Sequence, residues 1–465
     1  MPKRLTTVAL IASAVYLFYI AATSQLMILH DAIGYEKLGL LLKQGGWHDY
    51  LIHGPGREPL YPFFIAQSMH LADLAGINYI PMTMILQIFL LLLSQWLIVL
   101  LLHKLNVSDG ITAAVVLYAA FSPTLVNFTF ILWSELLTLP LVLSLILWTA
   151  QAWQKPDRPV IKALLSALLS LLLVLVKAVF EMVIPLFLLP FFIRLMWAMK
   201  QRHKTLTMHL SIFLVIFLTV FYAGINAYKY ANQICNGHYV IADRGPWALY
   251  GNIARRMQPL TGADMAAVVV VVPHKELCYA LLDAAPCAKW GEDTLSNQYG
   301  LAKERELRQQ DIATADGKLI KLSFQQMAAN PLQAAVLGFL EGCKLFFWEA
   351  YTDTAYVSYP RWVDYLYAGK TLQLTLRWAI NLLTIIGFIY ALSYLWKKRQ
   401  CVLQEKQDED TGILLCAVSM IIAYALPYSF FFLFGRYAIP MAGLYLVGIG
   451  FWLEHICGRK NQSRR

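Results

Sequence analysis

Long apolar runs separated by short polar connections form the dominant pattern of this chain. Each run reaches roughly 20 residues, the length at which a helix crosses the ~30 Å hydrocarbon core of a bilayer. Because lipid offers the backbone no hydrogen-bond partner, we expect every run to be a helix. The pattern predicts an all-α polytopic membrane protein with about ten transmembrane helices, at 5–29, 80–102, 111–130, 132–153, 160–176, 182–199, 206–225, 372–396, 412–434 and 438–456.

Polar stretches divide these spans into three parts. We expect an N-terminal transmembrane catalytic core at 1–225, which contains a first outer loop at 30–76. A large outer region follows at 226–371, and the C-terminal transmembrane helices with a basic cytoplasmic tail occupy 372–465. Within the first loop, residues 60–76 are apolar on one side, which is typical of a helix lying at the membrane interface.

The large outer region is predicted to fold as a small subdomain with interfacial helices. A β-branched run at 266–272 predicts a short strand, and 319–348 predicts helices that are interrupted at Pro331. Cys278 and Cys287 lie in the same region, where an oxidising compartment would allow them to form a disulfide. Two unpaired buried thiols are the alternative.

Composition and charge agree with a membrane protein. The chain is 59% hydrophobic and only 14% charged, whereas a soluble domain is nearer a quarter charged. The formal charge of +10 does not indicate a nucleic-acid partner, because the basic residues gather in one set of short loops. The positive-inside rule places these loops and both termini in the cytoplasm, and the two polar stretches outside. We expect an integral multi-pass protein of a bacterial inner membrane.

Two acids stand out in the first outer loop. Asp31 follows the first span directly, and ionisable residues at membrane depth cost ~2.5–3.5 kcal/mol on insertion scales. Glu58 is enclosed by glycines and by Pro59, so its backbone is constrained. Two carboxylates that face one cavity would supply a general base and an anchor for a metal or a hydrogen bond. The alternatives are an interfacial helix cap for Asp31 and a solvated loop acid, paired with Arg57, for Glu58.

Cations on the predicted outer side are candidates for binding a lipid phosphate, because Arg and Lys form charge-assisted hydrogen bonds with phosphate oxygens. They are Arg57, Lys177 and Arg436, with Arg244, Arg255 and Arg256 in the large outer region. Arg436 is the only charge between Asp410 and Glu454. Glu135 and Glu181 are expected to be ion-pair partners of Lys177 and Arg436. Purely structural ion pairs are the alternative for each.

Four short motifs in order resemble the GT-C superfamily of membrane glycosyltransferases, which includes protein O-mannosyltransferases and the aminoarabinose transferase that modifies lipid A. The first span leads into HDAIGYEKLGLLLKQGGW, and the loop closes on GREPLYPFFIA. Further along the chain are SPTLVNFTFILWSELL at Ser122–Leu137 and FGRYAIP near the C-terminus.

The resemblance implies a sugar donor linked through phosphate to a polyprenol, and a glycan, lipid or protein acceptor. It implies that Asp31 is the catalytic acid–base group or a metal-associated carboxylate, and that Glu58 is the second acid of the loop. The substrate-binding residues implied for the lipid phosphate and the sugar are Arg57, Tyr61, Glu135, Lys177, Arg436 and Tyr437.

Two departures from the family pattern leave the metal requirement open. Many members carry a second acid directly after the first, where this chain has Ala32, and some carry a lysine after the second acid, where it has Pro59. If a divalent metal binds, Asp31 and Glu58 are the candidate ligands.

The sequence thus predicts an inverting glycosyltransferase that uses a polyprenyl-phosphate sugar on the outer face of the membrane. A lipid-linked glycan ligase or polymerase is one alternative, and the early Asp31 loop favours the transferase. A lipid or sugar transporter without catalysis is another. Transporters are typified by internal repeats and midplane charges, whereas here no repeat is visible and the candidate charges lie at the outer ends of spans.

Overall fold

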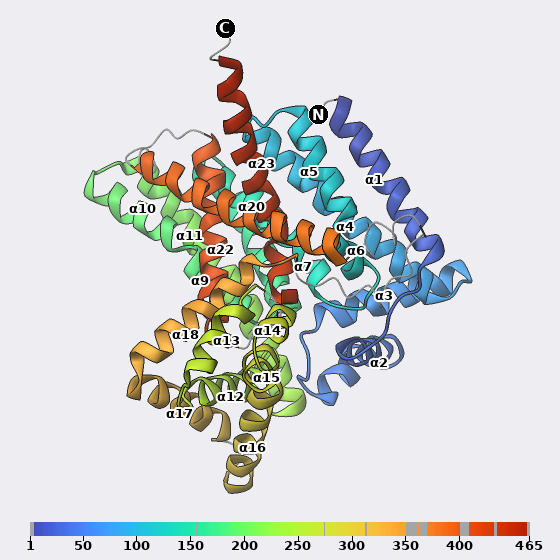
Figure 1. The fold of residues 1–465 in the computed structure, drawn as a ribbon, viewed down its shortest axis with the longest axis vertical. Coiled ribbons are helices and arrows are strands. Elements are labelled where there is room, and N and C mark those ends of the chain that lie inside the picture. The colour runs from blue at the N-terminus through green and yellow to red at the C-terminus, as the bar shows by residue number, and fades with distance from the viewer. Residues whose placement is uncertain are drawn as a thin grey trace. The chain divides into compact units, whose positions relative to one another are not determined.

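A computed structural model describes residues 4–154, 157–273, 275–311, 314–349, 361, 370–399, 409–431 and 435–462. These residues are predominantly helical (Figure 1), and within them β-pairing is limited to one isolated bridge between Met27 and Ile131. Nine helices of the described ranges are long and apolar enough to cross a membrane. A tenth span results if α5 (Asp109–Phe121) and α6 (Pro123–Thr129), which meet at 55°, are counted together. The predicted all-α polytopic architecture is confirmed.

The chain divides into two compact units. The first unit contains Met1–Ile241, Tyr351–Ile422 and Ile439–Arg465, and therefore combines N-terminal and C-terminal spans. The second unit contains Ala242–Ala350 and Ala423–Ala438. The three-part division at 1–225, 226–371 and 372–465 stays a prediction.

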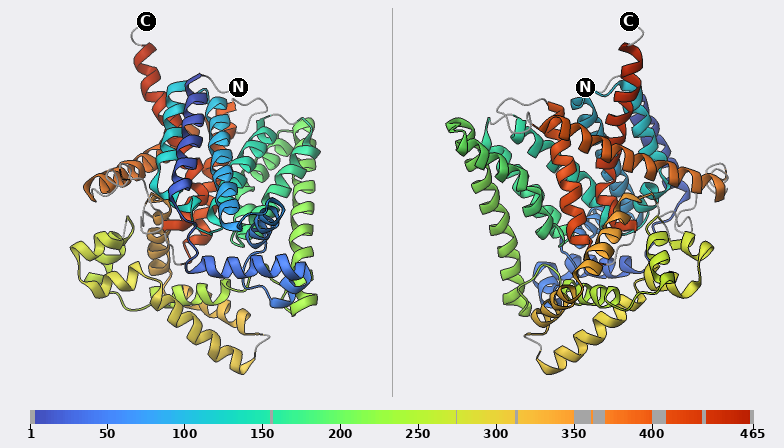
Figure 2. Two further views of the ribbon diagram at one scale, coloured as in Figure 1. Left: turned by 90° about the vertical axis from the view of Figure 1, so that its right-hand side faces the viewer. Right: turned by 60° about the vertical axis from the view of Figure 1, so that its left-hand side comes forward.

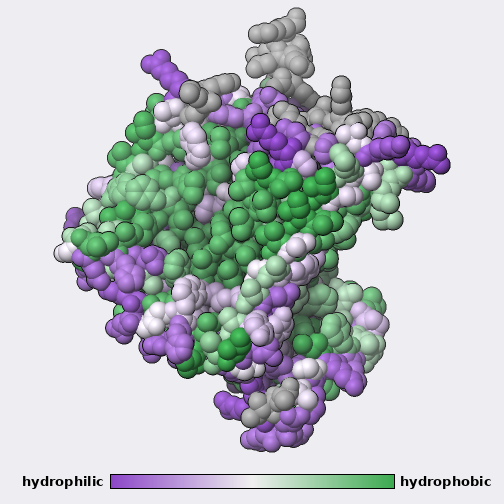
Figure 3. All heavy atoms as spheres, turned by 180° about the vertical axis from the view of Figure 1, so that it is seen from behind, coloured by the Kyte–Doolittle hydropathy of each residue, from purple (hydrophilic) through white to green (hydrophobic). Residues whose placement is uncertain are grey.

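The membrane-spanning helices bury one side against each other and expose large apolar side chains elsewhere. On the face drawn in Figure 3, hydrophobic side chains cover a broad continuous area, as expected for a surface that contacts lipid. Figure 2 shows α11 as a long green helix, and it packs against α8. Besides α5 and α6, the helices are α1 (Arg4–Thr23), α4 (Tyr79–Lys104), α7 (Glu135–Gln154), α8 (Pro159–Val176), α9 (Phe180–Phe187), α10 (Leu189–Lys200), α11 (Lys204–Asn236), α20 (Lys370–Lys397), α22 (Glu409–Tyr428) and α23 (Ile439–Gln462).

The bend between α5 and α6 has a local cause. The Ser122 side chain accepts the N–H of Leu125 at 3.2 Å and so caps α6. Pro123 occupies the first turn of α6, where its missing N–H costs nothing. The chain therefore starts a new helix at this point, within the stretch predicted as the span at 111–130.

The loop at 30–76 is itself mostly helical, in α2 (Asp31–His53) and α3 (Leu60–Ala75), which pack against each other. α2 begins directly after His30, which has a φ of 51°, and it is kinked at Gly46, which has a φ of 67°. A left-handed Gly76 ends α3. The helix predicted at 60–76 is thus present, and with 16 residues it is too short to be a candidate span.

Helices also build the second unit. α17 ends and α18 begins around Asn330 and Pro331, as predicted. Cys278 and Cys287 form a disulfide between α14 and α15, which decides between the two alternatives left open by the sequence. The elements are α12 (Gly245–Arg256), α13 (Gly262–Val271), α14 (Lys275–Leu281), α15 (Ala284–Gly291), α16 (Thr294–Gln310), α17 (Ala315–Ala329), α18 (Pro331–Cys343), η1 (Lys344–Phe346) and η3 (Gly435–Ala438).

The strand predicted at 266–272 is wrong, because this run belongs to helix α13. Thr261 and Asp264 form a reciprocal capping box that starts the helix. Ala267, Val268 and Val271 then face the hydrophobic core at helical spacing. A short apolar run does not distinguish strand from helix by itself, and here the cap and the packing outweigh β-branched propensity.

Candidate functional site

Asp31 and Arg57, predicted as a catalytic acid and a phosphate-binding cation, form an ion pair. Asp31 is the first residue of α2, and Arg57 lies in the turn before α3. The Arg57 guanidinium also lies over the ring of Tyr35, 4.9 Å from its centre. The hydroxyl of Tyr50 donates to the Arg57 carbonyl at 3.0 Å and so fixes the turn. The side chain of Asp31 is 26% exposed and that of Arg57 is 13% exposed, so a ligand can still reach the pair.

Glu58 links the loop at 30–76 to the end of a membrane span. Its Oε1 accepts the backbone N–H of Ala178 at 3.0 Å. Ala178 lies just beyond the last residue of α8. The second predicted acid therefore holds the loop against the connection between α8 and α9, next to Lys177.

Lys177 and Glu135 form a buried ion pair with an Nζ to Oε1 distance of 3.0 Å. Glu135 is one of the two acids predicted as ion-pair partners of Lys177 and Arg436, and the structure pairs it with Lys177. Glu135 is the first residue of α7, where the positive end of the helix dipole favours an anion. Glu181, the other predicted partner, contacts Lys229 instead at 2.5 Å.

Tyr35 is the side chain around which these charges gather. The pKa of Tyr35 is raised to about 12, and burial is the largest cause; Glu58 and Glu135 also raise it, whereas Arg57 and Lys177 lower it. Its hydroxyl lies 3.3 Å from the Ser134 hydroxyl. Tyr35 is not among the residues predicted from the sequence, although it follows Asp31 by four residues and therefore shares one face of α2 with it.

Tyr61 packs edge-to-face on Tyr35, with 5.0 Å between the ring centres. Its hydroxyl donates to Gln87 Oε1 at 3.2 Å, and the Gln87 amide donates to the Thr129 carbonyl at 2.8 Å. Burial raises the pKa of Tyr61 well above its ordinary value. Tyr61 is buried, and its ring packs against that of Tyr35 and helps to hold it in place.

The structure thus brings six predicted residues of the first unit into one cluster with Tyr35. We call it the Tyr35 cluster; its members are Asp31, Tyr35, Arg57, Glu58, Tyr61, Glu135 and Lys177. It contains three carboxylates and two cations, so its cations are already matched by acids. An incoming phosphate would have to displace a carboxylate from a cation or recruit further positive charge.

Arg436 and Tyr437 belong to the second unit. They lie in η3, where the Arg436 guanidinium is 5.3 Å from the centre of the Tyr437 ring. Tyr437 stacks on Tyr428 at 5.4 Å, and its carbonyl accepts the Tyr424 hydroxyl at 2.9 Å. Aromatic side chains therefore hold the Arg-Tyr turn that the sequence singled out.

A second charged group is buried within the second unit. Glu341 contacts Lys344 at 2.9 Å and Arg255 at 3.6 Å. Arg256 donates to the carbonyls of Ser429 and Phe431. Burial lowers the pKa of Arg256 to about 10. Burial alone would raise the pKa of Glu341, but the neighbouring cations outweigh it and lower that pKa, led by Lys344.

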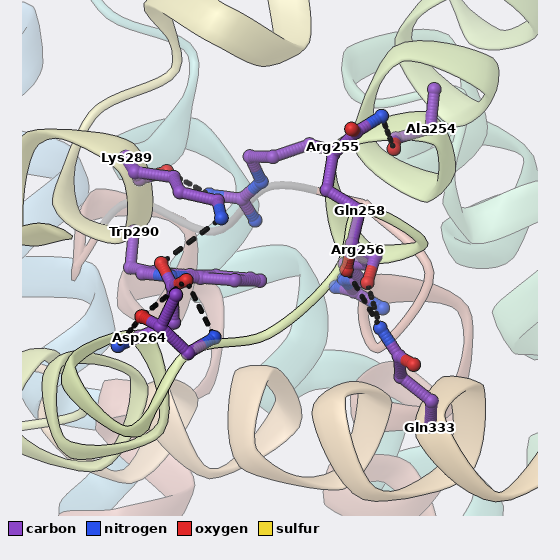
Figure 4. A network of polar contacts seen from close by, with 9 residues as sticks. Ala254, Arg255, Arg256, Gln258, Asp264, Lys289, Trp290 and Gln333 are labelled. Carbon is purple, nitrogen blue, oxygen red and sulfur yellow. Dashed lines mark hydrogen bonds and ion pairs between the residues drawn. The ribbon is translucent and has the colours of Figure 1, made fainter.

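Asp264 is the centre of a further polar network, drawn in Figure 4. It accepts hydrogen bonds from the Thr261 N–H at 3.0 Å and from the Trp290 indole at 2.9 Å, and it pairs with Lys289 at 3.0 Å. The Arg255 guanidinium lies 4.9 Å from the centre of the Trp290 ring. These contacts join α12, α13 and α15 within the second unit.

We expect Asp264→Asn to lower the free energy of unfolding by about 1.5–3 kcal/mol at pH 7, because hydrogen bonds to a charged group contribute about that much. Burial would raise the pKa of Asp264, but the hydrogen bonds from Thr261, Trp290 and Lys289 lower it below its ordinary 3.8. The stabilisation of the folded state by the Asp264 carboxylate is therefore present above pH 3.8, and it is lost as the pH falls through the lowered pKa of Asp264. The measurement is denaturant unfolding in mild detergent at several pH values.

Asp283→Ala is the control, because Asp283 is exposed and its side chain makes no capping hydrogen bond. It is expected to change stability by less than about 0.5 kcal/mol. Equal effects of Asp264→Asn and Asp283→Ala at pH 7 would contradict the account of the Asp264 network.

Metal binding by the predicted acids receives no further support from geometry. Among the described residues, no group of three or more His, Cys, Asp or Glu side chains is arranged to hold a metal ion. Asp31 is paired with Arg57, and Glu58 accepts a backbone N–H.

Comparison with protein-family models and with curated proteins finds no match to this chain. The resemblance to the GT-C superfamily therefore stays a prediction that rests on the four motifs. The geometry of the Tyr35 cluster is an independent observation, because it depends on no relative.

Proposed function

We propose that the chain is an inverting glycosyltransferase that moves a sugar from a polyprenyl-phosphate donor to an acceptor on the outer face of the membrane. The observation that carries this proposal is the contact between Asp31 and Arg57 beside Tyr35. It combines, in one accessible place, a carboxylate suited to proton transfer and a guanidinium suited to a phosphate.

In the proposed reaction, the donor phosphate takes the place of Asp31 on Arg57. The released carboxylate accepts the proton of the acceptor hydroxyl or amine. The acceptor atom forms its bond to the anomeric carbon while the bond from that carbon to the phosphate oxygen breaks. The electron pair leaves with the polyprenyl phosphate, and attack from the opposite side inverts the anomeric centre.

The other members of the proposed site hold charge and position. Stabilising the charge that develops on the leaving phosphate is commonly the largest electrostatic contribution to such a reaction. Arg57 supplies this in the Tyr35 cluster, with Lys177 as the further cation of the same cluster that we assign to the phosphate. Glu58 positions the loop, since its carboxylate holds the backbone next to Lys177.

The proposed orientation follows from loop charge. Basic residues concentrate at the ends of spans opposite the Asp31 loop, for example Lys104, Lys200 and Lys397. By the positive-inside rule those ends are cytoplasmic. The Tyr35 cluster then faces the outer compartment, where nucleotide-sugar donors are not supplied and lipid-linked donors are.

Replacing Arg57 with glutamine tests the proposed phosphate contact. We expect kcat/KM for the donor to fall about 10- to 100-fold, which corresponds to losing one charge-assisted hydrogen bond of about 1.5–3 kcal/mol. The KM for the acceptor is expected to stay unchanged. The assay uses the purified full chain in liposomes with polyprenyl lipids extracted from the host membrane, and measures release of polyprenyl phosphate.

Arg305→Gln provides the matched control, because Arg305 is an exposed arginine of α16. It should leave both constants as in the wild type. An Arg57→Gln variant whose dependence on donor concentration equals that of the control would refute the phosphate contact.

A further inference from the structure

An open groove of about 600 Å³ lies within the second unit. Its walls come from α12, from α16 and from the end of α17. The residues that line it include none of the side chains assigned to catalysis or to phosphate binding. The groove is therefore distinct from the proposed catalytic site.

Two tyrosine rings line the groove, Tyr250 from α12 and Tyr299 from α16. Both side chains are half-buried, so that each is held by packing and still presents surface. Tyr250 also packs against the small core formed by Leu307, Ala315 and Leu319. Rigid aromatic surfaces bury contact area at low cost in side-chain entropy, and they suit the C–H faces of sugar rings.

Amide side chains supply the polar part of the groove, at Gln258, Gln326 and Asn330. The Oε1 atom of Gln326 is buried and has no hydrogen-bond partner among the residues that the structure describes. A buried acceptor without a donor is destabilising, so a ligand that donates a hydrogen bond to this atom would stabilise the groove. Amides both donate and accept, which matches the hydroxyl groups of a carbohydrate.

The groove carries little net charge. Lys303 and Glu306, its charged lining residues, pair with each other at 2.7 Å. Small side chains at Ala254, Ala302 and Ala329 leave the space between the aromatic and amide groups open. A strongly anionic or cationic ligand would find no unmatched charge in this lining.

We infer that this groove binds a carbohydrate chain, with the tyrosine rings on sugar faces and Gln326 accepting a hydroxyl. That the bound carbohydrate is the acceptor of transfer rests on the proposed function. The carbohydrate-binding inference itself does not, because it derives from the groove alone.

The test is binding of the purified full chain, in detergent, to a printed array of bacterial cell-envelope glycans. The strongest ligand is then titrated calorimetrically as a free oligosaccharide. Tyr299→Ala is expected to weaken binding at least tenfold, whereas Tyr299→Phe, which keeps the ring, is expected to stay within about threefold of the wild type. Unfolding measurements verify that each variant is folded.

A second variant keeps the test decisive if Tyr299→Ala unfolds the protein. Ala302→Trp fills the groove from the exposed side of α16 and should abolish binding, and Arg305→Gln on the same helix should leave it unchanged. Absence of binding to every glycan on the array would overturn the inference. So would a bound glycan whose affinity is unchanged in Ala302→Trp.

The Asp31→Asn variant distinguishes a failure of the carbohydrate-binding inference from a failure of the proposed function. Asp31→Asn is expected to bind the array glycan as the wild type does, because Asp31 does not line the groove. Glycan binding together with normal transfer by Asp31→Asn would leave the groove standing and refute the catalytic assignment. Loss of transfer in Asp31→Asn, with no glycan binding by the wild type, would support the catalytic assignment and refute glycan binding in the groove.

Discussion

Asp31→Asn is expected to lower kcat for sugar transfer by about 10²- to 10⁴-fold, the range that a positioned general base contributes. The amide keeps the shape of the side chain but cannot accept the acceptor's proton at neutral pH. Because Asp31 is partly exposed and starts a helix rather than filling a core, the variant should remain folded. Single-turnover transfer with saturating donor measures the effect.

Asp49→Asn is the matched control for this prediction. Asp49 is an exposed acid of the same helix, with His48 as its neighbour at 3.3 Å. Its replacement should leave kcat within about twofold, because surface pairs of this kind contribute little. Equal activity of the Asp31 and Asp49 variants would remove Asp31 from the mechanism.

Glu341→Gln is expected to lower the free energy of unfolding by about 3–5 kcal/mol, the range seen when one partner of a buried ion pair is removed. Glu341 is 4% exposed, and it is the carboxylate that both Arg255 and Lys344 contact. Without it, these cations are buried beside a neutral amide. Denaturant unfolding of the full chain in mild detergent gives the change.

For comparison, Glu306→Gln breaks the exposed pair with Lys303 and should cost less than about 1 kcal/mol. The difference between the two free energies of unfolding shows how much of the effect depends on burial of the ion pair. If both variants unfold at the same denaturant concentration as the wild type, the buried charges of the second unit do not stabilise it as described.

The membrane architecture was predictable from sequence because its signal is strong and local. A run of about 20 apolar residues has few alternatives to a spanning helix. The interruption at Pro331 was predictable for the same kind of reason, since proline removes a helical hydrogen bond. By contrast, the strand predicted at 266–272 is wrong, because the β-branched residues favour a strand locally. The capping box at Thr261 and the packing of Val268 favour the helix that the chain forms there.

The candidate site was predictable in its residue types and less so in its partners. Lys177 and Glu135 were named from their places at span ends, and they pair in the structure. Tyr35 was not predictable in this way, because no pattern distinguishes a tyrosine on α2, and the charges around its ring come from other segments of the chain. Contacts between residues distant in sequence leave no periodic signal in a single chain.

The burial of Arg255 illustrates the same limit. In the sequence, an arginine of a polar region is expected to be solvated. In the structure its guanidinium lies on the Trp290 ring and donates to Asn252 at 2.7 Å, which makes burial tolerable. Asn252 precedes Arg255 by three residues on α12, whereas Trp290 lies on α15, and only the fold brings its ring to Arg255.

Mass spectrometry of cell-envelope lipids and glycans tests the central claim most directly. It would compare cells with the wild-type chain, cells without it, and cells with Asp31→Asn at equal protein level. We predict that the last two share one missing sugar on an envelope acceptor and accumulate the corresponding polyprenyl-phosphate sugar. An Asp31→Asn envelope that matches the wild type, or an unchanged envelope in cells without the chain, would contradict the account.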